Sequence, residues 1–292
     1  MTGHVAIPRL MLVTDRQRSP RPLPELVAAA IAGGVDAVNL REPDLEPSDM
    51  ARMATLLARV VAGQAVLLLN NAPSLAAELG LGVHLPEREL DSIGVRRQIG
   101  PDRLVGRSVH SAKAATTTSA ADYLLAGHVF ATSSKPLLTP LGSDGLRRII
   151  DAAGAPVLAI GGITADRVPT VLRSGAVGVA VIGAIADAEE PERAAAELRA
   201  VIDRELRAIE EGRMGTEPRE ATEHPEVKIV ANGKPLAVPR GTTIDDFLGS
   251  RGLSAGMTIV ERNGEVVPRT DYGATGLAAG DRLEVVHAVG GG

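Results

Sequence analysis

Short apolar runs alternate with amphipathic segments through the first two thirds of the chain. Eight of these runs predict strands, at residues 9–15, 37–42, 66–71, 82–86, 103–111, 121–130, 156–163 and 178–185. The helical segments between them include 24–34, 48–63, 73–80, 145–154 and 164–176. Because the strand runs are apolar throughout rather than alternating, they are typical of parallel strands that are buried on both faces.

Repeated strand and helix alternation favours a closed parallel barrel, the (β/α)8 TIM barrel. The alternative is an open doubly wound sheet, but the first turn lacks the G-x-G-x-x-G pattern of that class. A last amphipathic segment, residues 191–212, predicts the helix that closes the barrel. We therefore expect an α/β barrel domain over residues 1–211.

The pattern changes after residue 211. Residues 212–225 are polar, charged and interrupted by prolines, which predicts a linker. Residues 226–292 then give a hairpin with an Asn-Gly turn, one helix with a Thr cap, a second Asn-Gly turn and a final strand. This order predicts a small α+β domain of the ubiquitin-like β-grasp type.

Composition and charge argue against several classes of function. The only aromatic residues are Tyr123, Phe130, Phe247 and Tyr272, and the net charge is −5, which argues against nucleic-acid binding by base stacking or phosphate attraction. The chain has no cysteine, so thiolate metal sites and cysteine nucleophiles are excluded. No run has the length of a membrane span and the first residues lack a secretion pattern. These features predict a cytoplasmic protein that binds neither nucleic acid nor membrane.

Glycines at the ends of the last two barrel strands predict a phosphate site. Gly161 and Gly162 follow the seventh strand, and Gly183 and Ala184 follow the eighth. Exposed backbone N–H groups in these two loops bind phosphate in many barrels of this class. The alternative is that the glycines only turn the chain.

His128 lies near the end of the sixth strand, at the catalytic face of a barrel. Imidazole exchanges protons near neutral pH, so His128 is a candidate acid/base, although a lone histidine on an apolar strand is often structural. The loop Thr132 to Lys135 follows it, and this loop and Lys135 could close over an anion.

Other polar side chains at strand ends give weaker signals. Arg41 and Glu42 could pair with each other, but we favour Arg41 as the partner of a substrate carboxylate. Asn70 could bind a ligand or cap the next turn. His84 and His110 are expected to be structural. No set of carboxylates at the barrel mouth has metal spacing, so neither a metal nor a cofactor is expected.

The chain ends on Gly290, Gly291 and Gly292. A tail without side chains can enter the narrow active site of a partner and present its terminal carboxyl for adenylation. The alternative is an ordinary frayed terminus. Residues 226–292 resemble the sulfur carrier of thiamin thiazole synthesis, and the resemblance implies that Gly292, preceded by Gly291, carries a thiocarboxylate. It also implies two partners, an adenylating or sulfurtransferase enzyme acting on Gly292 and thiazole synthase.

Residues 8–205 resemble the superfamily of thiamin phosphate synthase and the thiazole tautomerase TenI. The motifs that carry the resemblance are LMLVTD, NLRE, GVHLP, GRSVHS, ADYLLAGHVF, IGGIT and VIGAI. Against the synthase pattern, Asn39, Pro43, Asn71 and Glu89 replace Gln, Lys, Asp and Asp, which removes charge needed for diphosphate and magnesium. His128 in GHVF resembles the tautomerases.

The resemblance therefore favours a bifunctional protein of thiamin thiazole synthesis. Its barrel would aromatise a carboxylated thiazole phosphate tautomer, with His128 moving the proton, and its second domain would carry sulfur. One alternative is a thiamin phosphate synthase, which couples a pyrimidine diphosphate to the thiazole phosphate, fused to the carrier. A further alternative is a barrel that only docks the carrier to its partners.

Overall fold

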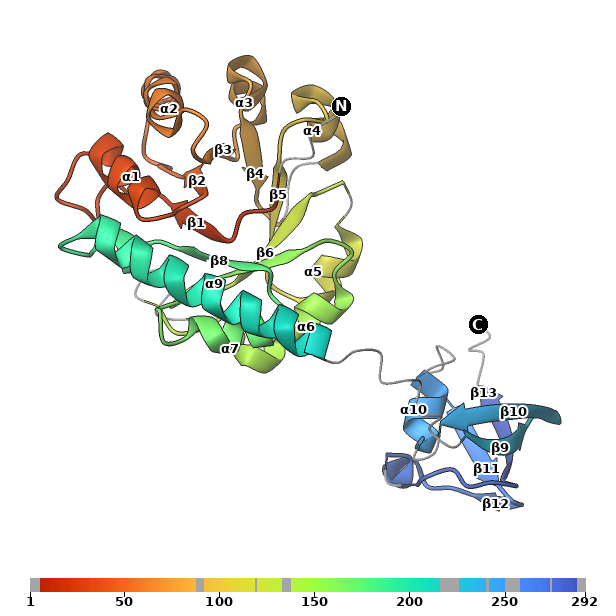
Figure 1. Ribbon diagram of the computed structural model, residues 1–292. Coiled ribbons are helices and arrows are strands. Elements are labelled where there is room, and N and C mark those ends of the chain that lie inside the picture. The colour runs from red at the N-terminus through yellow and green to blue at the C-terminus, as the bar shows by residue number, and fades with distance from the viewer. Residues whose placement is uncertain are drawn as a thin grey trace. The chain divides into compact units, whose positions relative to one another are not determined.

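A computed structural model describes residues 6–87, 92–118, 120–132, 138–215, 226–239, 242–249, 258–273 and 275–287. These residues divide into two compact units, Met1–Gly212 and Arg213–Gly292. In the first unit, eight parallel strands form a closed barrel with helices outside it (Figure 1). The predicted barrel is confirmed.

The first unit follows the predicted strand and helix order. Its strands are β1 (Leu10–Val13), β2 (Ala37–Leu40), β3 (Val66–Asn70), β4 (Gly82–Leu85), β5 (Val105–Val109), β6 (Tyr123–Gly127), β7 (Val157–Ile160) and β8 (Gly178–Val181). Its helices are α1 (Leu23–Ala32), α2 (Pro47–Val61), α3 (Pro73–Leu79), α4 (Ser92–Ile99), α5 (Ala112–Thr117), α6 (Gly142–Ala152), α7 (Val168–Arg173), α8 (Gly183–Ala186) and α9 (Pro191–Gly215). Helix α9 thus extends into the segment that the sequence predicts as linker, and residues 216–225 lie outside the described residues.

Burial on both faces explains why the strands read as unbroken apolar runs. Leu10 and Leu12 of β1 point outward into the core between strands and helices. Met11 and Val13, the alternate residues, point into the barrel and pack with Tyr123 and Leu125 of β6. The interior is therefore a packed core below the strand ends, and side chains at the C-terminal ends of the strands are left to form a site.

The second unit contains β9 (Glu226–Ala231), β10 (Lys234–Pro239), α10 (Ile244–Gly249), β11 (Thr258–Arg262), β12 (Glu265–Val266), a 3-10 helix η2 (Arg269–Asp271) and β13 (Arg282–His287). The sheet order is β10-β9-β13-β11-β12, with β13 parallel to β9, as expected for a β-grasp domain. Its core includes Phe247 of α10 and Tyr272, both of which are buried.

Local chemistry accounts for the turns of this domain. Asn232 and Gly233 have φ values of 47° and 74°, and Asn263 and Gly264 have 55° and 92°, so both predicted Asn-Gly turns form with left-handed residues. At the start of α10 the Thr243 hydroxyl accepts from the Asp246 N–H at 3.2 Å, while the Asp246 carboxylate accepts from the Thr243 N–H at 3.0 Å. This reciprocal cap confirms the predicted Thr cap.

Helix α9 packs directly on the end of α1 at a glycine. A Cβ added at Gly33 would lie 2.6 Å from the Cβ of Ala195 and closer still to the carbonyl oxygen of Glu192. Since φ at Gly33 is −80°, an ordinary value, the requirement for glycine is steric and comes from α9.

We expect Gly33→Ala to destabilise the barrel by about 1–3 kcal/mol, because α9 or α1 must move to admit the methyl group. Gly154→Ala is the matched control, since nothing lies within 4 Å of a Cβ at Gly154. Thermal unfolding of the full chain measures both. Equal melting temperatures for the two variants would contradict the packing described at Gly33.

Candidate active site

A cavity of about 660 Å³ opens at the C-terminal ends of the barrel strands. The sequence-predicted residues that line it are Arg41, Asn70, His128, Gly161, Gly162, Gly183 and Ala184. The cavity therefore brings together seven candidates from five strand ends. Lys135, Gly291 and Gly292 lie outside the described residues.

His128 is held at the cavity wall by its backbone and its ring. Its carbonyl accepts from the Leu141 N–H at 2.9 Å, and its Nε2 lies 3.1 Å from the Leu138 carbonyl oxygen. A carbonyl only accepts, so Nε2 carries the proton in this contact, and Nδ1 of the neutral ring keeps the lone pair. His128 is 6% exposed, so a bound ligand would meet it largely away from water.

Gly161 leaves the space in which His128 sits. A Cβ at Gly161 would lie 2.7 Å from the His128 Cα, and its φ of 103° is one that other residues rarely adopt. The backbone after His128 is hydrogen-bonded to the end of β7, since the Phe130 N–H donates to the Gly161 carbonyl at 3.0 Å. Gly161 therefore has a packing role of its own, in addition to any contact with an anion.

Charged side chains surround the loops after β7 and β8. Arg167 donates to the Gly162 carbonyl at 2.6 Å and lies 4.8 Å above the Phe130 ring centroid. Arg18 pairs with Asp187, with Nε donating to Oδ1 at 2.8 Å. A Cβ at Gly183 would lie 2.6 Å from Asp187 Oδ2, so this ion pair passes close to the glycine backbone.

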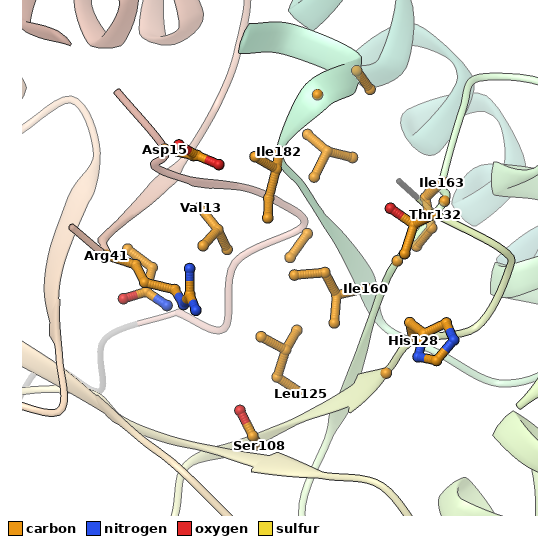
Figure 2. Close-up of a pocket in the computed structure, with 18 of the residues that line it drawn as sticks. Val13, Asp15, Arg41, Ser108, Leu125, His128, Thr132, Ile160, Ile163 and Ile182 are labelled. Atoms are coloured by element: carbon orange, nitrogen blue, oxygen red, sulfur yellow. The ribbon is translucent and has the colours of Figure 1, made fainter. Parts of the chain in front are cut away.

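Arg41 and Glu42 do not pair with each other, one of the two possibilities that the sequence leaves open. The Glu42 carboxylate, 2% exposed, accepts from the Arg16 N–H at 3.0 Å and holds the loop after β1. Among the described residues, no group accepts a hydrogen bond from the Arg41 guanidinium. Arg41 lies across the cavity from His128 and Thr132 (Figure 2).

The cavity also includes polar residues that the sequence did not rank as site residues. Asn39 is 1% exposed, and among the described residues its Oδ1 has no hydrogen-bond partner. The sequence marks Asn39 only as a departure from the synthase pattern, and its position two residues before Arg41, at the end of a strand with alternating faces, is a further signal that could have identified it. Asp15 and Arg18, which follow β1, could have been found as charges directly after a strand end.

The two histidines that the sequence predicts as structural both line the cavity. His84 is buried, with Nδ1 3.1 Å from the Tyr123 hydroxyl and Nε2 2.9 Å from the Ser108 hydroxyl. His110 pairs through Nδ1 with the Glu87 carboxylate. Both histidines thus make polar contacts at the cavity in addition to any packing role.

In the part of the chain that the structure describes, no group of three or more His, Asp or Glu side chains could hold a metal ion. Nor is any described helix long and apolar enough to cross a membrane. Asn71 has a φ of 54° and its N–H donates to the His84 carbonyl at 2.8 Å, so it forms the turn after β3. Glu89 lies outside the described residues.

Comparison with known proteins gives two family matches. Residues 10–185 match the family described as thiamine monophosphate synthase, and residues 216–292 match the ThiS family. The barrel is 37% identical to a thiamine-phosphate synthase of Roseiflexus sp. over 65% of this chain and 84% of the relative. It is 38% identical to one of Natronomonas pharaonis, over 66% and 94% respectively.

A solved structure has the same fold. The thiamine phosphate pyrophosphorylase of Pyrococcus furiosus matches with a TM-score of 0.61 and 31% identity, and the match covers 68% of this chain and 96% of that one. The relatives thus cover the barrel, and the ThiS match covers the second domain. Together they confirm the predicted fusion of these two kinds of domain.

The burial of His84 predicts a pH dependence of stability. Burial lowers the pKa of His84 to about 4, from an ordinary value of 6.5. The unfolded chain then binds the proton first as the pH falls, so the stability from neutral His84 is complete above pH 6.5 and is lost between pH 6.5 and 4. We expect a loss of about 3 kcal/mol over this range.

Tyr272→Phe provides the background for this measurement, because Tyr123 is then the only tyrosine and its fluorescence follows barrel unfolding. Denaturant unfolding at pH 7 and at pH 4 gives the free energy of unfolding of the Tyr272→Phe protein and of the same protein with His84→Gln added. The variant should lack the His84 part of the pH dependence. An equal change in both proteins would contradict the lowered pKa.

Proposed function

The chain belongs to the thiamine monophosphate synthase family, with a ThiS family domain C-terminal to its barrel, and we propose that the barrel aromatises a carboxylated thiazole phosphate tautomer by proton transfer at His128. The observation that carries the proposal is the contact of His128 Nε2 with the Leu138 carbonyl, which leaves Nδ1 as the basic nitrogen of the neutral ring. Because Nε2–H donates to the Leu138 carbonyl, Nδ1 keeps its lone pair and can act as a base.

The proposed step balances with one acid/base. Nδ1 of His128 takes the proton from the thiazoline ring carbon, and the electron pair of that C–H bond moves into the ring as the exocyclic double bond shifts. The imidazolium then returns the proton to the exocyclic carbon, which regenerates the neutral ring. Aromatisation makes the reaction downhill, so little is needed beyond positioning and one proton carrier.

Binding of the substrate is assigned to the remaining cavity residues. The backbone at Gly161, Gly162, Gly183 and Ala184, with the loop that contains Lys135, would hold the phosphate. Arg41, whose guanidinium has no partner among the described residues, would pair with the substrate carboxylate. Asn70 at the end of β3 would donate to the same ligand.

Thiamine-phosphate synthesis, the coupling of a pyrimidine diphosphate to the thiazole phosphate, is the second candidate. The curated relatives are named thiamine-phosphate synthase, and these names favour it over the tautomerase. Against it stand Asn39, Pro43 and Asn71 at positions where the synthases are expected to use a glutamine, a lysine and a carboxylate. Because the described donors do not form a metal-binding group, we derive no step through magnesium.

For the second domain, we propose that Gly292 carries sulfur as a thiocarboxylate for a thiazole synthase. The ThiS match extends through residue 292 and supports this assignment. An adenylating enzyme would activate the Gly292 carboxyl, and a sulfur donor would displace AMP from it. When the carrier domain is bound to the thiazole synthase, the linker would raise the local concentration of the barrel near that enzyme. The barrel would then act on the product of the thiazole synthase.

The first test compares two reactions on the purified full chain. One is aromatisation of the carboxylated tautomer, followed by ultraviolet absorbance, and the other is coupling with pyrimidine diphosphate, thiazole phosphate and magnesium. We expect aromatisation, and we expect His128→Gln to lower kcat by about 10²–10⁴-fold, because the amide can still donate to the Leu138 carbonyl but cannot exchange a proton.

Removal of Gly292 is the matched control, since it alters the other domain and should leave aromatisation unchanged. Thiamin phosphate formation without aromatisation would overturn the tautomerase in favour of the synthase. Inactivity in both assays would favour a barrel that only recruits the carrier.

A second test addresses the carrier. Incubation of the full chain with ATP, an adenylating enzyme of this class and a sulfur donor should give a mass increase equal to replacement of one oxygen by sulfur. The modification should map to Gly292 and be absent when Gly291 and Gly292 are removed. Gly154→Ala, in the barrel, should still be modified. Modification at an internal residue would contradict the proposal.

A further inference from the structure

Three hydrogen-bonded side chains have no role in the proton transfer proposed above: His84 and Ser108, which line the cavity, and Tyr123, which is buried beside His84. His84 of β4 and Tyr123 of β6 are paired in register with the same residue of β5, Gly106. A Cβ at Gly106 would lie 2.6 Å from Cε1 of Tyr123, so only glycine lets the tyrosine ring cross β5. The Tyr123 and His84 rings then stack with their centroids 5.8 Å apart.

Tyr123 fixes which nitrogen of His84 accepts. The Tyr123 side chain is 0% exposed, and burial raises the pKa of its hydroxyl above the ordinary value, so the hydroxyl keeps its proton. Among the described residues its hydrogen-bond partner is Nδ1 of His84, at 3.1 Å. A buried O–H that donates to nothing is costly, so Nδ1 is the acceptor of this bond.

The opposite nitrogen of His84 must then donate. A neutral imidazole has one N–H, so Nε2 carries the proton when Nδ1 accepts. Nε2 lies 2.9 Å from the Ser108 hydroxyl oxygen, which therefore accepts from it. Neutrality follows from the surroundings, since His84 is 1% exposed and its hydrogen-bond partners in the described residues are two hydroxyl groups without charge.

Ser108 is left with a hydroxyl hydrogen to donate. It lines the cavity, and its oxygen points toward the cavity interior, on the side away from Thr132 and Ile163 (Figure 2). Arg41 lines the same cavity. An arginine and a serine donor together suit a carboxylate, whose oxygens only accept.

We propose that His84 is a positioning residue held in its Nε2–H form by Tyr123, and that it thereby makes Ser108 a hydrogen-bond donor to the substrate carboxylate. The carboxylate part rests on the proposed function. The order of donors and acceptors does not, because it follows from the buried contacts alone.

The tautomer is measured first, without ligand. Long-range proton–nitrogen NMR of the ¹⁵N-labelled full chain, assigned by comparison with His84→Gln, should show His84 neutral at pH 7 with the proton on Nε2. Tyr123→Phe should shift the equilibrium toward the Nδ1–H form, because the donor to Nδ1 is gone. Tyr272→Phe, which removes a buried hydroxyl in the other domain, should leave His84 unchanged. An Nδ1–H form or an imidazolium in the unaltered protein would overturn the proposal.

Binding tests the ligand assignment. Calorimetry compares the aromatic carboxythiazole phosphate with the thiazole phosphate that lacks the carboxylate. Ser108→Ala and Tyr123→Phe should each weaken binding of the carboxylated ligand by about three- to tenfold and leave the other ligand unchanged. Equal loss for both ligands, or no loss, would overturn the carboxylate assignment. If neither ligand binds the unaltered protein, the proposed function fails, while the tautomer result still decides the role of His84.

Discussion

Closure of the eight-stranded sheet is the constraint on which the candidate site depends. The first and last strands pair in parallel, with Leu12 opposite Val181, and this pairing places the C-terminal ends of all eight strands around one opening. The interior below that opening is filled by side chains such as Met11 and Leu158. A ligand is therefore confined to the strand ends, where Arg41 and His128, distant in the sequence, line one cavity.

The loops after β6 and β7 act as one structural unit at this opening. The Val129 N–H donates to the Ile160 carbonyl at 2.9 Å, and the next N–H, that of Phe130, donates to Gly161. Because Gly161 also leaves the room for His128, the position of the proposed proton carrier depends on the backbone of the loop proposed to bind phosphate. If the proposed roles hold, ligand binding and proton transfer would be coupled through this short segment rather than through a long path.

Apolar runs, Asn-Gly turns and the Thr cap predicted both folds because each depends on local chemistry or on burial of both faces of a strand. The contacts between side chains on different strands of the barrel were harder to predict from the sequence. The contact between His84 and Tyr123 requires that both residues lie in register with Gly106, and the sequence pattern does not indicate the register of these three strands. The partner of Glu42 is the backbone of a loop 26 positions away, Arg16, and no helical or strand spacing indicates it.

The barrel fold is compatible with either of the two proposed reactions, so the charges of the cavity matter more than its fold. Asp187 is paired with Arg18, while Asp15, Arg41 and Arg167 also line the cavity, so its wall carries charges of both signs. At Asn39 a buried Oδ1 lacks a partner within the described part of the chain, a cost of about 1–3 kcal/mol. A ligand that donates a hydrogen bond to this oxygen would recover that free energy on binding. On the proposed function, such a cavity would orient an acid with one phosphate rather than neutralise a diphosphate.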